Sequence, residues 1–229
     1  MLNYNIIKDF VDELINRRND VELFTEDYVR YVLICTLRKK SIGINYSIEV
    51  PYIRNGKPTK FGLNNTSCFA NEKSRLDLCV ENGNGNPNDV IEFKFHRKTK
   101  YSNNCSTTKA GSVFNDLNRL SIISNSNNRY LVYVFDASMH SSLNHKNSYN
   151  AYVISDKFKN GSCARIDTTY HTLNNGKTYS EDFTNRALSS FNDNYKCFSK
   201  FSYSVECIFN DGFQVGNDDF WCIVLEVKD

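Results

Sequence analysis

The fold of this chain is decided by residues 74–95, which read SRLDLCVENGNGNPNDVIEFKF. At both ends of the stretch, 74–80 and 90–95, apolar and branched residues recur in the pattern of β-strands. Between them, residues 81–89 are rich in asparagine, glycine and proline, which favour tight turns. The stretch therefore predicts a β-hairpin.

Three charged side chains lie on this hairpin. Asp77 is in the first strand, and Glu92 and Lys94 are two residues apart in the second. Because side chains alternate along a strand, Glu92 and Lys94 share one face and the apolar residues beside them share the other. Two carboxylates and an ammonium on a sheet face suit a Mg²⁺ site that hydrolyses phosphodiesters. An ordinary cross-strand ion pair on a surface hairpin is the structural alternative.

An Asp, a loop and then Glu-x-Lys on adjacent strands resemble the motif of the PD-(D/E)xK nuclease superfamily, which includes many restriction endonucleases. A helix pattern at 109–120 and a strand pattern at 129–135 follow, in the order of the shared core of such nucleases. Leu76 stands where the motif name has a proline. The resemblance covers about residues 25–155 and implies an α/β fold with a restriction-endonuclease-like core, a mixed β-sheet flanked by helices.

The same resemblance implies how the site works. Asp77 and Glu92 would hold Mg²⁺, or Mn²⁺ in its place, and Lys94 would orient a water or stabilise charge on the phosphate. Such nucleases often draw a further carboxylate from an earlier element. Glu26 is the favoured candidate for this metal ligand and Glu49 the alternative. Glu26 is equally explained as a first-turn helix acid, and Glu49 as a solvated strand residue.

Positive charge gathers directly after Lys94. His96 continues the same strand face, Arg97 and Lys98 follow it, and Lys109 stands at the entrance of the next helix, where a phosphate could bind. These four residues are the predicted nucleic-acid contacts. A solvated basic loop and an unpartnered lysine are the alternatives, and His96 is either a proton carrier near neutral pH or a partly exposed strand-end residue.

Two further charged pairs are not assigned to the site. Asp116 and Arg119, three residues apart on the helix pattern, are expected to pair with each other and to need no catalytic role. Glu226 and Lys228 form a second Glu-x-Lys at the end of the sequence, where no element follows to complete a core. We expect this second pair to be a charged strand face.

Hydrophobic periodicity predicts the remaining elements. Apolar residues 3.6 apart indicate helices, alternating ones indicate strands, and polar runs indicate loops. We expect helices at 4–18, 26–40 (capped by Thr25) and 181–191; strands at 45–53, 151–154, 201–209 and 220–227; turns at 55–58 and from 210–212 onward; and a loop at 137–150. Residues 1–229 are expected to form a single domain, with 156–229 as a C-terminal extension packed on it.

Composition narrows the class of protein. The 229 residues carry a net charge of only +2, so any affinity for nucleic acid must come from a local patch. Eight cysteines are present, none in a CxxC spacing, which disfavours a zinc site. The first 22 residues show no apolar signal stretch, and no segment approaches the ~20 apolar residues of a membrane span. We therefore expect a soluble protein of the reducing cytoplasm, without a membrane.

Together these patterns predict a Mg²⁺-dependent endonuclease acting on DNA, in restriction or defence against foreign DNA. A homodimer would place two sites on opposite strands of a duplex, although no residue pattern demands one. The first alternative is a nucleic-acid-binding module that keeps the nuclease fold without catalysis. The second is a structural or protein-interaction domain, in which the basic patch would be inert.

Overall fold

The computed structural model of the chain describes residues 2–16, 24–40, 45–63, 73–97, 106–144, 154–155, 158–169, 180–191 and 200–228. These ranges contain five helices and nine strands. In chain order they are α1 (Tyr4–Asn16), α2 (Glu26–Lys39), β1 (Asn45–Pro51), β2 (Ile53–Arg54), β3 (Lys57–Pro58), β4 (Arg75–Glu81), β5 (Pro87–His96), α3 (Ser106–Ser121), β6 (Asn128–Asp136), α4 (Ala137–Leu143), β7 (Cys163–Thr169), α5 (Glu181–Ala187), β8 (Lys200–Val215) and β9 (Asp218–Lys228).

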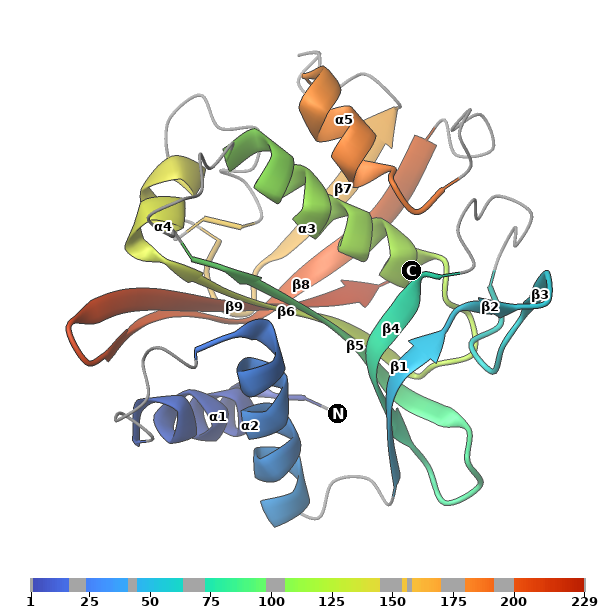
Figure 1. Cartoon of the computed structure of the whole chain (residues 1–229), viewed down its shortest axis with the longest axis horizontal. Coiled ribbons are helices and arrows are strands. Elements are labelled where there is room, and N and C mark those ends of the chain that lie inside the picture. The colour runs from blue at the N-terminus through green and yellow to red at the C-terminus, as the bar shows by residue number, and fades with distance from the viewer. Residues whose placement is uncertain are drawn as a thin grey trace.

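Seven of the described strands form one mixed sheet, in the order β1-β4-β5-β6-β9-β8-β7. β5 and β6 are parallel, and the other neighbouring pairs are antiparallel. The C-terminal strand β9 lies between β6 and β8, so the last part of the chain shares the sheet with the predicted core. β2 and β3 form a separate small hairpin beside β1, at the right-hand margin of Figure 1.

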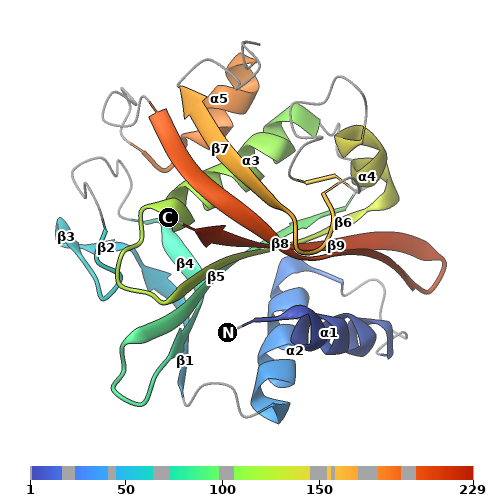
Figure 2. The ribbon, with the colours of Figure 1, turned by 180° about the vertical axis from the view of Figure 1, so that it is seen from behind.

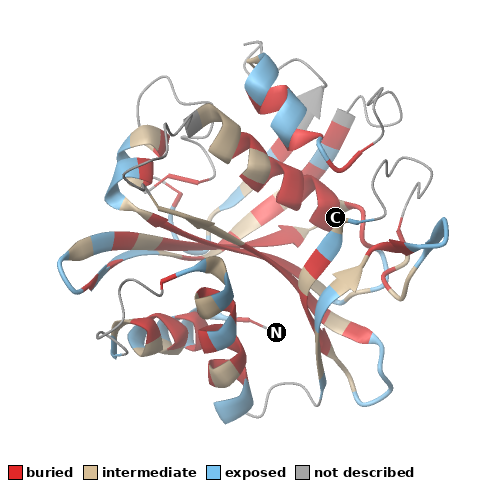
Figure 3. Cartoon of the chain, viewed as in Figure 1, coloured by how far each residue is buried: buried red, intermediate tan, exposed pale blue. Residues whose placement is uncertain are grey.

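Helices cover both faces of the sheet. α1 and α2 lie on one face, and α3, α4 and α5 lie on the other, as the two opposite views show (Figures 1 and 2). The central strands are accordingly buried along most of their length (Figure 3). The chain is thus an α/β protein with a large mixed sheet flanked by helices, as its sequence predicts.

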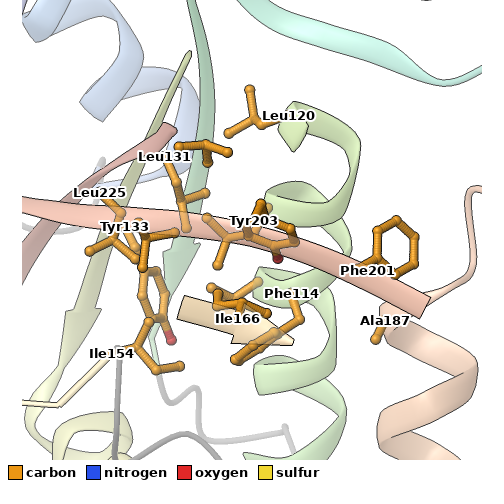
Figure 4. Close-up of a cluster of buried hydrophobic side chains, with 14 of the residues drawn as sticks. Phe114, Leu120, Leu131, Tyr133, Ile154, Ile166, Ala187, Phe201, Tyr203 and Leu225 are labelled. Atoms are coloured by element: carbon orange, nitrogen blue, oxygen red, sulfur yellow. The ribbon is translucent and has the colours of Figure 1, made fainter. Parts of the chain in front are cut away.

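Two hydrophobic clusters lie on opposite faces of the sheet, and successive side chains of the central strands enter them alternately. Ile91 and Phe93 of β5 pack on the side of α1 and α2. The cluster on the other side joins α3 to the sheet, and its members include Phe114 and Leu120 of α3 and Leu131 of β6 (Figure 4). Because strand side chains alternate, the even-numbered residues of β5 point toward α3.

Most of the predicted elements are present. β4 and β5 pair as an antiparallel hairpin, and α3 and the parallel strand β6 follow in the predicted order. α2 begins where its cap was predicted, because the amide of Tyr28 donates to the Thr25 hydroxyl at 3.3 Å. The Asn55-Gly56 turn joins β2 to β3, and both residues take the positive φ that such a hairpin turn needs.

The predicted loop at 137–150 is wrong for its first half, because Ala137–Leu143 forms α4. Asp136 caps this helix by accepting the Met139 amide at 2.9 Å. Met139 and Leu143 are buried, but two apolar residues in a polar run leave a weak periodic signal. The remainder, 145–150, lies outside the described residues.

The C-terminal strands are longer than predicted. β8 continues through Asn210–Gly212, where a turn was expected, and reverses at Gly216-Asn217, with Val215 paired to Asp218. Gly216 has a φ of 63°, which glycine adopts without steric cost. The turn chemistry of Asn210–Gly212 was misleading because the long hairpin pairs those residues with β9.

Other boundaries also differ. The strand expected at 45–53 ends at Pro51, and β2 begins only at Ile53. The helix expected at 181–191 ends at Ala187. Of the strand expected at 151–154, only Ile154 is described, and it lies in a bend. β7 was not predicted from the sequence at all.

Gly111 marks the point where α5 packs on α3. A Cβ at this position would stand 2.7 Å from the Phe183 carbonyl oxygen and 3.0 Å from the Cβ of Arg186. Alanine normally favours a helix over glycine by about 1 kcal/mol, but a backbone carbonyl cannot swing aside as a flexible side chain can. We expect Gly111→Ala to lower the free energy of unfolding by about 1–3 kcal/mol in urea titrations.

The neighbouring change Ser112→Ala serves as the control, with an expected effect within about 0.5 kcal/mol. Equal or greater stability for Gly111→Ala would contradict this close approach of the two helices.

No helix in the described ranges is long and apolar enough to cross a membrane. The five cysteines in these ranges, Cys35, Cys79, Cys163, Cys207 and Cys222, are free thiols.

Candidate functional site

The candidate site lies where β4 and β5 separate. Their ladder reaches Leu78 paired with Ile91, and the next residue of β4 is Asp77. Its carboxylate accepts the Phe93 amide at 2.7 Å, a donor that a continuing β4 would otherwise have used. Two residues further along β5, the Phe95 amide donates to Glu26 at 3.0 Å. The freed edge of β5 is therefore capped by one carboxylate from β4 and one from α2.

Glu92 lies beside this fork, on the face of β5 that meets α3. Its side chain is 1 % exposed. One carboxylate oxygen accepts the hydroxyl of Tyr52 and lies 3.3 Å from an Arg119 nitrogen. Burial raises the pKa of Glu92 well above its usual range, Arg119 opposes the rise, and Asp77 adds to it. Glu92 therefore favours a proton or a cation close by.

Asp77 shares this environment. Burial raises the pKa of the Asp77 carboxyl, while a hydrogen bond from Glu92, the Phe93 amide and Arg30 all lower it. The two carboxyl groups thus interact: Asp77 raises the pKa of Glu92, and Glu92 lowers the pKa of Asp77. Adjacent carboxyls that resist simultaneous ionisation are a frequent feature of catalytic and cation-binding sites.

Lys94, the third member of the motif, is held by a helix residue that the sequence did not assign to the site. Its ammonium lies 2.8 Å from the Asp116 carboxylate of α3. Burial lowers the pKa of Lys94, but Asp116 and Glu26 outweigh it, so the net shift is upward. Lys94 is therefore a permanent positive charge at neutral pH.

Asp116 and Arg119 pair with each other, as predicted, but each also contacts the motif. Asp116 binds Lys94, and Arg119 approaches Glu92. The Arg119 guanidinium also lies over the ring of Tyr52, at 5.6 Å from its centroid. One turn of α3 thus holds Glu92 and Lys94 of β5 in place.

Arg30 of α2 is the centre of a second group of charges. Its guanidinium lies 2.7 Å from Glu49 and 3.1 Å from Asp77. Asp27 and Glu26 lie further away, at 3.6 and 4.0 Å. Both candidates for a further acid, Glu26 and Glu49, therefore surround Arg30. Glu49 also has a φ of 54°, a conformation that is costly for a residue with a side chain.

Negative charge exceeds positive charge in this region. Burial raises the pKa of Glu26 as it does those of Asp77 and Glu92. The group contains more carboxyls than cations: the acids are Glu26, Asp27, Glu49, Asp77, Glu92 and Asp116, and the cations are Arg30, Lys94 and Arg119. A further cation would relieve this imbalance.

Asp77 and Glu92 have the chemistry that Mg²⁺ requires, because both offer carboxylate oxygens to a hard ion and both gain from added positive charge. In the described part of the chain, however, no three Asp, Glu, His or Cys residues form a group that could hold a metal ion. The pair fits a cation, and Glu26 does not assemble with it as a third ligand. Glu26 instead uses its carboxylate on the Phe95 amide.

The predicted nucleic-acid contacts differ from one another in charge, burial and partners. His96 is partly buried, contacts the Tyr133 hydroxyl at 2.9 Å, and has its pKa lowered to about 3 by burial and by the neighbouring cations Lys94, Lys109 and Arg186. It is therefore uncharged near neutral pH and unsuited to carrying a proton there.

Arg97 pairs with Asp218 of β9 at 2.7 Å. Lys109 is half-buried in the first turns of α3, and burial lowers its pKa. Lys98 lies outside the described residues. Of the three predicted contacts that the structure describes, His96 and Lys109 lie near the Lys94 face, and Arg97 is paired with Asp218 instead.

The second Glu-x-Lys is separate from the site. Lys228 pairs with Glu226 at 2.6 Å and with Glu206 at 3.4 Å. Glu226 is opposite Tyr130 in the sheet, and Tyr130 belongs to the cluster on the α1 and α2 side. This pair is a charged strand feature on the other face, as expected.

The sequence did not predict that Tyr52 and Arg30 belong to the site, nor that Asp116 and Arg119 contact it. Only Asp116 and Arg119 could have been suspected from the sequence, because their two charges interrupt the apolar stripe of α3. Comparison of the chain with family models, curated proteins and solved structures found no match.

Proposed function

We propose that this chain is a Mg²⁺-dependent endonuclease of the PD-(D/E)xK type, which hydrolyses DNA phosphodiester bonds at Asp77, Glu92 and Lys94. The observation that supports this most directly is the meeting of the three side chains where β4 and β5 separate, with the two carboxyls interacting and the ammonium held beside them. Strand, turn, strand, helix and strand surround them in the order such nucleases use.

Each residue has a distinct task in this proposal. Asp77 and Glu92 would hold the metal ion, which, when bound, polarises the phosphate and lowers the pKa of a water ligand. Lys94 stays protonated because Asp116 binds it, and so stabilises negative charge developing on the phosphate instead of accepting a proton. Tyr52 and Arg119 orient Glu92.

The biological role follows from the resemblance rather than from the geometry. We propose that the enzyme acts on foreign DNA in the cytoplasm, and that a homodimer would cut both strands. The alternative function, a nucleic-acid-binding module without turnover, is favoured by one observation. The acids already have protein partners, Arg30 for Asp77 and Arg119 for Glu92, so these residues can keep their places in the fold without a metal ion or catalysis.

Cleavage assays on plasmid, phage and single-stranded DNA, with Mg²⁺ or EDTA, test the proposal. We expect the wild type to cut with Mg²⁺, and Lys94→Met to lose about a hundredfold or more of that activity, since it removes a charge that acts on the transition state. Lys228→Met makes the same change in the second Glu-x-Lys and should leave cleavage intact.

Melting temperatures of both variants show whether any loss reflects unfolding. If the wild type cuts no substrate but wild type and variants bind DNA alike, the binding module replaces the nuclease. If Lys94→Met cuts as well as the wild type, the site has been placed wrongly.

A further inference from the structure

An open groove lies beside the small β2–β3 hairpin, next to the candidate site. Its volume is about 560 Å³. It runs between the end of β1 and the hairpin, which is largely exposed (Figure 3). Its lining includes Val50, Arg54, Asn55, Lys57, Thr59 and Lys60.

The groove is basic. Arg54 and Lys57 are exposed, and within the described residues their side chains form no hydrogen bond or ion pair. Lys60 pairs with Glu81. None of the described residues that line the groove is acidic. Arg54 and Lys57 therefore create a local positive potential on the hairpin, beside a region with excess carboxylates. The net charge of +2 for the whole chain does not reveal this local potential.

The hairpin is joined rigidly to the candidate site through Tyr52, the residue directly before β2. The Thr59 amide donates to the Tyr52 carbonyl at 3.0 Å, and the Thr59 hydroxyl donates to the Pro51 carbonyl at 2.7 Å. Tyr52 in turn donates its hydroxyl to Glu92. A molecule held in the groove would therefore rest against the element that orients Glu92.

We propose that this groove binds the phosphate backbone of duplex DNA, with Arg54 and Lys57 as the cations that contact it. The inference rests on the proposed function, because a DNA cleaved at Asp77 and Glu92 has to be held beside an acidic centre by positive charge from elsewhere. The β2–β3 hairpin beside the groove is a two-stranded ribbon with exposed cations and an Asn-Gly tip. Such a ribbon is narrow enough to lie along the major groove of the DNA while its cations contact the phosphates.

Fluorescence anisotropy with a labelled DNA duplex, in EDTA and over a range of salt concentrations, tests the groove without cleavage. We expect Arg54→Ala with Lys57→Ala to weaken binding on the order of tenfold or more at ~0.1 M salt. The slope of log affinity against log salt concentration should become less steep by about two, since two phosphate contacts are lost. The control is Lys159→Ala with Arg165→Ala, the same charge change near β7 at the opposite edge of the sheet.

The control pair should leave both affinity and slope near the wild-type values. Unchanged affinity and slope in the Arg54 and Lys57 variant would overturn the inference, whether or not the wild type cuts DNA. So would a wild type that ignores duplex DNA and binds only single strands, RNA or an acidic peptide. A wild type that binds through the groove but never cuts would support the groove and refute the nuclease.

Discussion

Glu92→Gln is expected to lower Mg²⁺-dependent cleavage by about a thousandfold. The same substitution should make the protein more stable at pH 8 in EDTA. Activity falls because an amide cannot supply the anionic oxygen that a hard cation prefers. Stability rises because the folded protein disfavours the ionised carboxylate at this position, and burial is the largest cause. Glutamine keeps the shape of the side chain and can still accept from Tyr52.

The direction of the pH dependence follows from the raised pKa of Glu92. The folded-state pKa lies well above the ordinary 4.5, so the folded chain binds this proton more tightly than the unfolded chain does. The resulting stability is complete below about pH 4.5 and is lost as the pH rises through the folded-state pKa. Urea titrations should therefore show Glu92→Gln gaining about 1 kcal/mol over the wild type at pH 8 and little at pH 4.5.

Glu81→Gln is a matched control with the opposite sign. Lys60 and Ser47 lower the pKa of Glu81 on the neighbouring strand, so its carboxylate stabilises the fold at neutral pH and that contribution is lost as the pH falls. Glu81→Gln should therefore be less stable than the wild type at pH 8 and should still cut DNA. A Glu92→Gln protein that is less stable than the wild type at pH 8 would contradict the buried, proton-favouring environment of Glu92.

The local part of the site was predictable from the sequence because it depends on one hairpin. Turn residues between two β-patterned runs determine that Asp77 and Glu92 come together, and the period of two places Lys94 beside Glu92. No long-range information is needed for either step. The mixed sheet flanked by helices followed from the order of helical and strand patterns in the same way.

The partners of these residues could not be predicted, because they depend on how distant elements pack. Asp116 reaches Lys94 only because the apolar stripe of α3 settles on the sheet at one particular rotation, which no local pattern specifies. Arg30 reaches Glu49 and Asp77 across 19 and 47 residues of sequence. No sequence pattern singled out Tyr52, because its hydroxyl contact with Glu92 joins residues 40 positions apart.

The order of the strands in the sheet could not be predicted from the sequence either. Sequence patterns indicated a strand in the first part of β8 and another over most of β9, but nothing in them specified that β9 would pair with β6. Pairing of distant strands is decided by the register that buries the most side chains on both faces. Asn210–Gly212 illustrates the consequence, since turn-forming residues are accommodated inside β8 when the partner strand continues alongside.

Arg119→Met is expected to be the most destabilising substitution in the site, lowering the free energy of unfolding by about 3–5 kcal/mol at pH 8. The guanidinium contacts Glu92 and Asp116, and both acids are 1 % exposed. Methionine fills a similar volume but leaves the two carboxylates with Lys94 as their remaining nearby cation on this face. A buried charge that loses its partner costs far more than the pair contributes, because water cannot replace the lost contact.

The size of this loss should depend on pH. Arg119 lowers the pKa of Glu92, so its removal raises that pKa further, and the variant can relieve the penalty by taking up a proton. The destabilisation should therefore shrink as the pH falls toward 4.5. Arg165→Met, at an exposed arginine of β7, should change stability by less than about 0.5 kcal/mol at either pH. A pH-independent loss, or none at all, would mean that Arg119 does not compensate these carboxylates, and that another cation balances Glu92 in the folded chain.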